Sequence, residues 1–270
     1  MTESLVAILA AVHHEILLFA VVGLAVGGID DFLVDILFLC RRWWRQVTIY
    51  SRHPRMTTAT LPASEKPGRI AVFVPAWGEA EVIAPMLRNA LDRWREGDYR
   101  IFVGVYPNDH ATLQAVAPVA EGEERLIVCV NERPGPTTKA DCLNLLWRTM
   151  EREESRTGTR FKAVVLHDAE DVVHADEIRL FDLMIDRFQL VQLPVLPLPG
   201  HGNWWARGIA NHYCDEFAES HGKYLTIREA MGCVRPFGRR RLRLRAEHAG
   251  TAGRCGQGRS VRPRLADRGL

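Results

Sequence analysis

An almost uninterrupted apolar stretch at the amino terminus constrains this chain more than any other feature. Residues 5–40 contain few polar positions, and about 20 apolar residues are enough to cross a bilayer. We expect a single span centred on Ile16–Ile29, with Phe32–Cys40 continuing along the membrane interface. A buried core helix is the alternative. A cleaved signal peptide is disfavoured because no basic residue precedes the apolar run.

Charged residues at the end of this stretch indicate its orientation. Three aspartates, Asp30, Asp31 and Asp35, are costly at membrane depth. They should therefore lie at the interface or pair with Arg41 or Arg42. Basic residues follow the span at once and none precedes it, so the positive-inside rule places the rest of the chain in the cytoplasm.

Residues 1–50 are expected to form the transmembrane and interfacial anchor. A linker follows over 51–69, which is rich in Pro, Thr and Ser and has no periodicity. From residue 70 onward, short apolar runs alternate with segments of helical spacing. Strands are predicted over 70–74, 99–106, 126–130, 161–166 and 190–196, and helices over 81–94, 112–119, 138–151, 176–188 and 204–221. Alternation of this kind predicts an α/β domain over 70–232, with a mostly parallel sheet and helices on both faces.

The strand predicted over 161–166 runs directly into the acids Asp168, Glu170 and Asp171. Ligands of open α/β sheets bind at the carboxyl ends of the strands, and clustered carboxylates need a positive partner. A divalent metal that holds a diphosphate is one interpretation, and a solvated turn that caps the next helix is the other. No GxGxxG or GxxxxGK[ST] motif is present, and the six Cys include no CxxC pair, which argues against a zinc site.

Four short motifs, in this order, resemble those of family 2 glycosyltransferases with the GT-A fold. They are Val72–Glu79, Tyr106–Asp109, Thr138–Asn144 and the acids at Asp168–Asp171. More narrowly, an amino-terminal span ending at Ile29-Asp30-Asp31, followed by this domain and by Tyr213–Glu219, is similar to the inner-membrane type of bacteriophage-adsorption protein B. The resemblance covers about residues 16–232.

The resemblance implies a site for a nucleotide-diphospho-sugar, most simply a UDP-sugar. The implied donor-binding residues are Pro75, Glu79, Asp109, Lys139 and Asp168, and the implied ligands of Mg²⁺ or Mn²⁺ are Asp168 and Glu170. Glu170 stands where the family usually has Asp. His167 and His174 are interpreted as structural, and Asp171 as a candidate cap of the next helix.

The chain changes character after residue 232. Residues 233–270 contain 11 Arg, no Lys and few apolar residues, so we expect a disordered tail without a core. A nucleic-acid-binding tail is one interpretation, but we favour a frameshift that truncates the domain, and we expect no nucleic-acid partner. The general base of an inverting family 2 enzyme would then lie beyond residue 232, which leaves Asp215 and Glu216 as weak candidates.

Two functions follow as expectations. The first is a glycosyltransferase anchored in the bacterial inner membrane, which transfers a sugar to an envelope or polysaccharide acceptor and is inactive if truncated. The second is a non-catalytic membrane module of an envelope or phage-adsorption assembly, with membrane lipid and an envelope protein as partners.

Overall fold

The computed structural model describes residues 2–198, 203–232 and 243–245. These residues form two compact units. The helical unit comprises the chain up to Arg55 together with the described residues from Pro194 to Gly232, and the sheet unit comprises residues 56–193 with 243–245. The described residues from Pro194 to Gly232 thus group with the amino-terminal helix, and the predicted domain over 70–232 stays a prediction.

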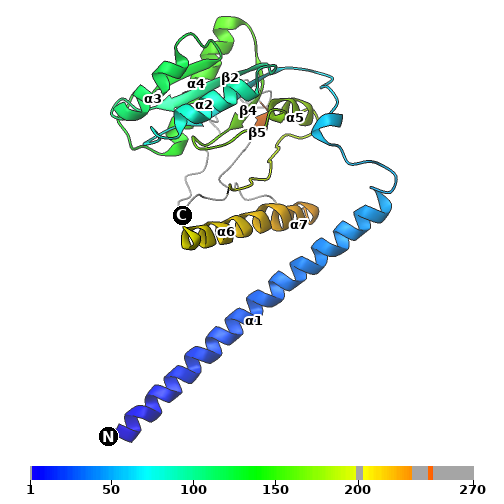
Figure 1. The fold of residues 1–270 in the computed structure, drawn as a ribbon, viewed down its shortest axis with the longest axis vertical. Coiled ribbons are helices and arrows are strands. Elements are labelled where there is room, and N and C mark those ends of the chain that lie inside the picture. Colours follow the sequence, from blue (N-terminus) through cyan, green and yellow to red (C-terminus); the bar gives the residue numbers. More distant parts are fainter. Residues whose placement is uncertain (1, 199–202, 233–242, 246–270) are drawn as a thin grey trace, which may run out of the picture. The chain divides into compact units, whose positions relative to one another are not determined.

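The sheet unit is built on a five-stranded sheet (Figure 1). Its strands are β1 (Arg69–Pro75), β2 (Tyr99–Val105), β3 (Leu126–Val130), β4 (Phe161–Leu166) and β5 (Arg243–Arg245), in the order β3-β2-β1-β4-β5. The first four strands are parallel, whereas β5 pairs antiparallel to β4. The predicted, mostly parallel sheet is confirmed.

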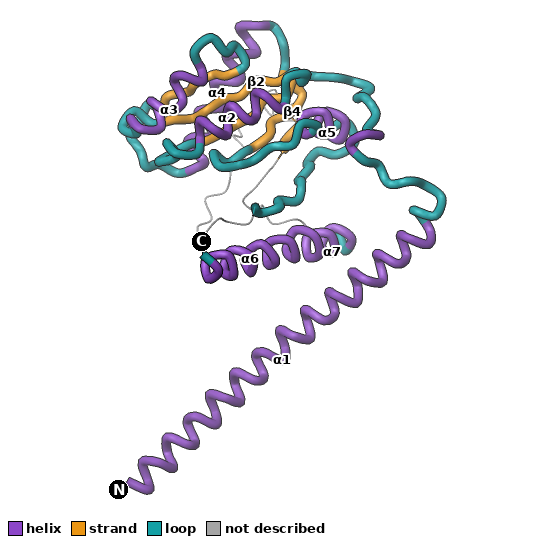
Figure 2. Tube along the Cα trace, viewed as in Figure 1, coloured by secondary structure: helices purple, strands orange, loops and turns teal. Residues whose placement is uncertain are grey.

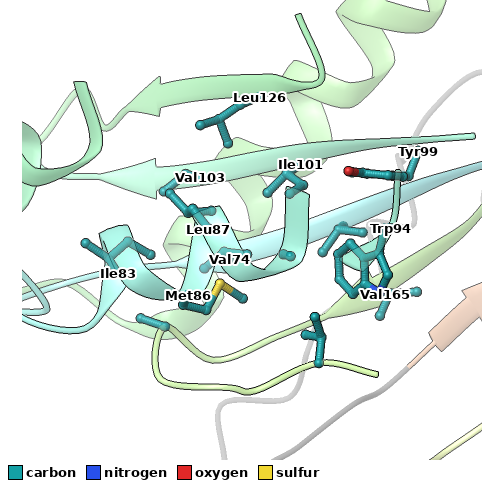
Figure 3. Packing of buried hydrophobic residues seen from close by; sticks show 14 of the residues in the cluster. Val74, Ile83, Met86, Leu87, Trp94, Tyr99, Ile101, Val103, Leu126 and Val165 are labelled. Carbon is teal, nitrogen blue, oxygen red and sulfur yellow. The ribbon is translucent and has the colours of Figure 1, made fainter. Parts of the chain in front are cut away.

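Helices cover both faces of this sheet, as predicted (Figure 2). They are α2 (Ile83–Arg93), α3 (His110–Ala120), α4 (Lys139–Thr157) and α5 (Glu177–Met184). Alternate residues of β1 point to opposite faces. Val72 and Val74 join a core with α2, α3 and α5 (Figure 3), whereas Phe73 joins a core with α4. Burial on both faces explains the continuous apolar runs of the strands.

Helix α4 approaches β2 closely at Gly104. A Cβ atom at this position would lie 2.3 Å from Cys142 Sγ and 3.2 Å from Leu146 Cδ2. Only a residue without a side chain lets α4 pack at this distance. Because α4 begins at Lys139, this packing also fixes the position of that lysine relative to the sheet.

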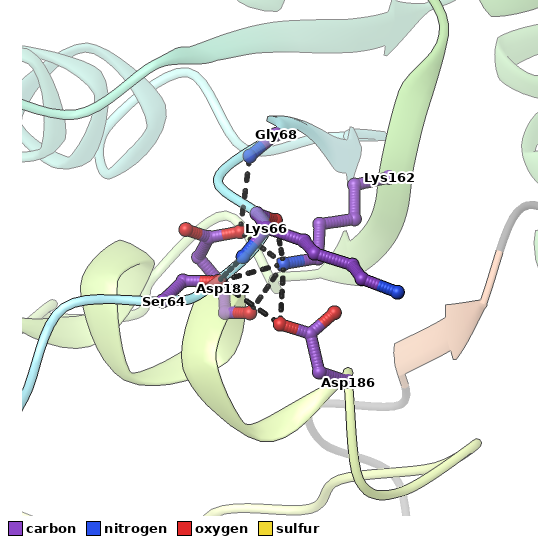
Figure 4. Close-up of polar contacts among 6 residues, drawn as sticks. All are labelled: Ser64, Lys66, Gly68, Lys162, Asp182 and Asp186. Carbon is purple, nitrogen blue, oxygen red and sulfur yellow. Dashed lines mark hydrogen bonds and ion pairs between the residues drawn. The ribbon is translucent and has the colours of Figure 1, made fainter.

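The second half of the predicted linker is docked on the sheet unit rather than being a free tether. Leu61 is buried, and Lys162 of β4 lies at the centre of a polar cluster that includes Ser64 (Figure 4). Lys162 Nζ donates to Asp182 Oδ1 at 2.7 Å and to Asp186 Oδ2 at 3.0 Å. The linker residues were predicted from composition alone, which carries no information about such distant partners.

The strand predicted over 190–196 is absent: these residues have no regular secondary structure. Pro194 lies within the segment and Pro197 just beyond it. Proline has no backbone N–H to donate to a strand neighbour. The apolar alternation was therefore a misleading signal, and the chain passes here from one compact unit to the other.

The helical unit contains α1 (Thr2–Thr48), α6 (Trp204–Glu219), the π-helical turn η2 (Ser220–Tyr224) and α7 (Leu225–Ala230). Within the described part of the chain, α1 is the one helix long and apolar enough to cross a membrane. This confirms the predicted long apolar helix. It continues unbroken through the predicted interfacial segment, Phe32–Cys40.

The aspartates of α1 contact the segment after α6, not the arginines of α1. Lys223 Nζ lies 2.6 Å from Asp35 Oδ1, and Tyr224 donates its hydroxyl to Asp31. Of the two expected alternatives for these acids, pairing with Arg41 or Arg42 is not what Asp31 and Asp35 show, and a position at the membrane interface stays a prediction. A sequence pattern favours partners nearby in the chain, but these partners are 188 and 193 positions away.

The predicted tail without a core lies mostly outside the described residues. Its three described residues, Arg243–Arg245, form β5 and extend the sheet beside β4. The frameshift hypothesis concerns the coding sequence and stays a prediction.

Candidate functional site

The carboxyl ends of β1, β2 and β4 meet at one edge of the sheet because the three strands are neighbours and parallel. The predicted site residues Glu79, Asp109 and Asp168 each follow one of these strands. Gly78, beside Glu79, donates its backbone N–H to Asp109 Oδ2 at 2.6 Å. The structure therefore brings together side chains that are about 90 positions apart in sequence.

Glu79 lies in a field of negative charge. Its pKa is raised, first by partial burial and then by the charges of Glu170, Asp168 and Asp109. Four carboxylates thus share this edge, and the other three disfavour the ionisation of Glu79. A cationic ligand, or a ligand that brings its own cation, would relieve the repulsion.

Asp109 performs a structural task in addition to its predicted role. Its side chain caps α3 by accepting from the backbone N–H of Thr112 at 3.2 Å. Partial burial would raise the pKa of Asp109, but hydrogen bonds from Gly78 and Thr112 outweigh it and lower the pKa. Asp109 is therefore held in place as a carboxylate, with Oδ2 bound to the loop after β1 and Oδ1 bound to the first turn of α3.

Lys139 is the cation of this edge. It stands at the first residue of α4, which Thr138 caps by accepting from the backbone N–H of Asp141. Its ammonium group contacts Asp168 Oδ1. The Lys139 side chain is 52% exposed and that of Asp168 19% exposed, so the pair is open to solvent on the lysine side.

The backbone of Asp168 is also supported by a buried cluster of three side chains, whose mutual contacts were not predicted from the sequence. His167 Nδ1 lies 3.0 Å from Asp171 Oδ2 and His167 Nε2 lies 3.3 Å from Glu177 Oε1. Asp171 Oδ2 also accepts from the backbone N–H of Asp168 at 3.1 Å. Asp171 is thus not the cap of α5, which has Asp176 at its first flanking position, but a support of the loop that carries Asp168. The structural role predicted for His167 agrees with its complete burial.

Glu170 is exposed at the same edge. Among the described residues, no three His, Cys, Asp or Glu side chains are gathered in a preformed metal site. One or two carboxylates nevertheless suit Mg²⁺ and Mn²⁺, because substrate phosphates and water supply the other oxygen ligands. Asp168 and Glu170 fit that donor set in number and in chemistry.

Aromatic and polar residues in the loops that carry these acids contact one another. These contacts were not predicted from the sequence. The Trp77 ring lies edge-on to Tyr106, with centroids 5.0 Å apart. Asn108 and the backbone of Gly135 exchange two hydrogen bonds, each of 2.7 Å. A Cβ atom on Gly135 would lie 2.3 Å from the Trp77 ring. The Pro-Gly-Pro sequence around Gly135 signalled a turn, but not which loop it contacts.

The remaining predicted residues take no part in the contacts described above. Pro75 is the half-buried last residue of β1. Asp215 and Glu216, the weak candidates for a general base, are exposed on α6, which belongs to the helical unit and not to the unit that carries the acids.

Comparison with known proteins defines the family. The family model described as "Glycosyltransferase like family 2" matches residues 67–246. The chain belongs to this family. The match runs past residue 232, where the resemblance was predicted to end, and includes β5. Family membership and the parallel sheet together confirm the predicted fold class.

Curated relatives agree with this assignment. The chain is 40% identical over 207 residues to bacteriophage adsorption protein B of Escherichia coli K12, and equally to bacteriophage N4 adsorption protein B of E. coli O157:H7. The matched region covers 76% of this chain and 27% of each relative. The chain thus spans about a quarter of the length of the curated relatives.

Solved structures show weaker likeness. The mannosyltransferase PcManGT from Pyrobaculum calidifontis, in complex with GDP-Man and Mn²⁺, has a TM-score of 0.42 at 18% identity, over 60% of this chain and 45% of that one. Glucosyl-3-phosphoglycerate synthase from Mycobacterium tuberculosis, in complex with UDP, has a TM-score of 0.41 at 17% identity, over 73% and 64%.

Proposed function

We propose that the sheet unit binds a nucleotide-diphospho-sugar, most simply a UDP-sugar, and transfers its sugar to an envelope or polysaccharide acceptor. One observation carries the proposal. In a family 2 glycosyltransferase domain, four carboxylates and one lysine gather where three parallel strands end. Glu79 and Asp109 would contact the nucleoside, while Lys139 would offset the charge of the diphosphate.

A divalent cation completes the proposal. Asp168 and Glu170 would hold Mg²⁺ or Mn²⁺, and the bound metal acts as a Lewis acid on the departing diphosphate. The protein's own part is to hold Asp168 in place through Asp171 and Lys139. Because Lys139 contacts the same carboxylate, it would also balance the charge of Asp168 before the donor binds.

The acceptor half of the reaction needs a further carboxylate, which acts as a general base. Inversion at the anomeric carbon requires a general base to remove the proton of the attacking hydroxyl. We place that base beyond residue 232, and a chain that lacks it would bind the donor without transferring the sugar.

The membrane part of the proposal rests on α1. Its length and hydropathy suit a single span, and the basic residues after it favour a cytoplasmic sheet unit. We therefore propose an anchor in the bacterial inner membrane. Protease accessibility in right-side-out and inverted vesicles would test the orientation, and protection of the sheet unit in inverted vesicles would contradict it.

Donor binding tests the site directly. Titration calorimetry with UDP-sugars should show binding with Mn²⁺ and at least tenfold weaker binding without it, since Asp168 and Glu170 would hold the cation and its charge would offset that of the diphosphate. Asp168→Ala and Glu170→Ala should each cause a comparable loss. Asp92→Ala is the control, because Asp92, near the end of α2, forms an exposed pair with Arg95 just beyond this helix. Equal binding by all variants would refute the assigned site.

One observation favours a second function. The described base candidates, Asp215 and Glu216, belong to the other compact unit. A non-catalytic module of an envelope or phage-adsorption assembly, with an envelope protein as partner, would keep the fold without turnover. Donor binding that depends on Mn²⁺, followed by release of UDP with an acceptor, would exclude this alternative. Absence of metal-dependent binding would favour it.

A further inference from the structure

Helix α6 exposes a row of large apolar side chains. Trp205, Ile209 and Tyr213 are four residues apart and so lie on one face of the helix. Their exposed fractions are 65%, 74% and 56%. Trp204 precedes them, 70% exposed, and its ring stacks on Trp205 at 3.8 Å. We call Trp204, Trp205, Ile209 and Tyr213 the aromatic row.

The opposite face of α6 is polar. Arg207, Asn211 and Asp215 follow the same spacing half a turn away, and all three are exposed. The helix is therefore amphipathic, with an apolar face that the described residues leave largely uncovered. Trp and Tyr are enriched where one end of a side chain meets hydrocarbon and the other meets water.

The segment that follows α6 is attached to α1 at a defined level. Lys223 pairs with Asp35, and Tyr224 donates to Asp31. Helix α7 packs on α1, and its Ile227 is buried. These contacts begin where the aspartates interrupt the apolar run and continue toward the basic end of α1. A membrane-spanning α1 must leave the hydrocarbon at this level, since carboxylates are costly at depth.

We propose that α6 is an interfacial helix whose aromatic row inserts into the headgroup boundary of the bilayer that α1 crosses. The proposal rests on the membrane anchor stated under Proposed function. Its physical basis is continuity: η2 and α7 hold the end of α6 beside the point where α1 leaves the hydrocarbon, and the row supplies the side chains that favour this boundary. Such helices bury their apolar face about 5–10 Å into the boundary.

This arrangement has a consequence for the proposed enzyme. Helix α6 follows the sheet unit directly in the chain, so insertion would bind that unit to the membrane at a second point besides the linker. Two points restrict rotation of a tethered domain more than one does. The proposed transferase would then work on acceptors that are presented at the membrane surface.

Depth-dependent fluorescence quenching tests the proposal. The full chain is reconstituted in phosphatidylethanolamine–phosphatidylglycerol vesicles with an environment-sensitive dye on Cys, introduced by Ile209→Cys or Asn211→Cys. Cys40, Cys214, Cys233 and Cys255 are replaced by Ser, whereas Cys129 and Cys142 are buried and stay. A lipid quencher near the headgroups should reduce the signal at position 209 by about threefold more than at 211. Position 209 should also be quenched more strongly by this lipid than by one that carries its quencher at the chain end.

A third label separates this inference from the anchor itself. Leu24→Cys places the dye in the middle of α1, where the quencher at the chain end should be the stronger. If position 24 is quenched but 209 is not, or if 209 and 211 respond alike, the interfacial helix is refuted and the anchor stands. If 209 is shielded from both lipid and water-soluble quenchers, protein covers the row and the inference fails. Quenching at 209 without quenching at 24 would refute the span, and with it the inference that α6 lies at the boundary of the bilayer that α1 crosses.

Discussion

Lys162 and Lys139 both contact aspartates next to β4, but at opposite ends of that strand and in different surroundings. Lys162, near the amino end, is 14% exposed and contacts two carboxylates, a hydroxyl and two backbone carbonyls. An ammonium has three donors, so these acceptors saturate it. Lys139, at the carboxyl edge, contacts Asp168 and is 52% exposed. A saturated cation stabilises the fold, whereas an open one can bind a ligand.

The largest expected effect is on stability, at Lys162. Lys162→Ala removes the cation between Asp182 and Asp186 and leaves the two carboxylates facing each other in a largely buried position. Loss of one partner of such a cluster costs about 3 kcal/mol in the free energy of unfolding. Chemical denaturation of the full chain in detergent measures it.

Lys66→Ala is the matched control for this experiment. Lys66 takes part in the cluster through its backbone carbonyl, and its side chain is exposed. The substitution should change the free energy of unfolding by less than about 0.5 kcal/mol. Equal losses for Lys162→Ala and Lys66→Ala would show that the cluster contributes nothing specific.

Asp109 should give the next largest effect on the free energy of unfolding. It belongs to the functional edge, but both of its carboxylate oxygens accept hydrogen bonds from the protein. Asp109→Ala removes the cap of α3 and the bond to Gly78, at a cost of about 1–2 kcal/mol. Asp109→Asn keeps an acceptor and should lose less. The pKa of Asp109 is lowered by folding, so its contribution is present above the ordinary value of 3.8 and is lost as the pH falls through the folded value. Stability profiles of wild type and Asp109→Ala that stay parallel in acid would contradict this assignment.

Lys139→Ala should separate binding from stability. We expect donor affinity to fall about tenfold, as for the loss of one hydrogen bond to a charged group. The free energy of unfolding should change by less than about 1 kcal/mol, because the pair with Asp168 is solvent-exposed on one side. Calorimetry and denaturation on the same preparation measure both, with Lys139→Arg as the charge-preserving control. A stability loss as large as that of Lys162→Ala would remove the distinction between the two lysines.

The smallest expected effect has the opposite sign. Glu79→Gln removes one of four repelling carboxylates, so it should raise the free energy of unfolding by about 0.5 kcal/mol at neutral pH while weakening donor binding. The raised pKa of Glu79 means that its charge destabilises the folded protein above the ordinary value of 4.5. The gain should therefore disappear in acid, where the group is protonated in both states. Thermal unfolding across this pH range without ligand measures the gain, and a variant less stable than wild type at neutral pH would contradict it.

Elements with a local signal could be predicted from the sequence. The strands over 126–130 and 161–166 agree residue for residue with β3 and β4, because a run of apolar residues between turn signals needs no knowledge of its partner. The position of Asp168 after such a strand, and the parallel sheet implied by the alternation, placed the acids at one edge. The length of the apolar helix was equally evident.

The contacts between charged side chains that lie far apart in the sequence depend on the tertiary fold. It placed Asp171 between His167 and the backbone of Asp168 instead of at a helix cap, and it saturated Lys162 while leaving Lys139 open. It paired Asp31 and Asp35 of α1 with Tyr224 and Lys223. Periodicity reports which face of an element is buried. The identity of the group that meets a buried charge depends on how separate elements pack, which local sequence does not encode.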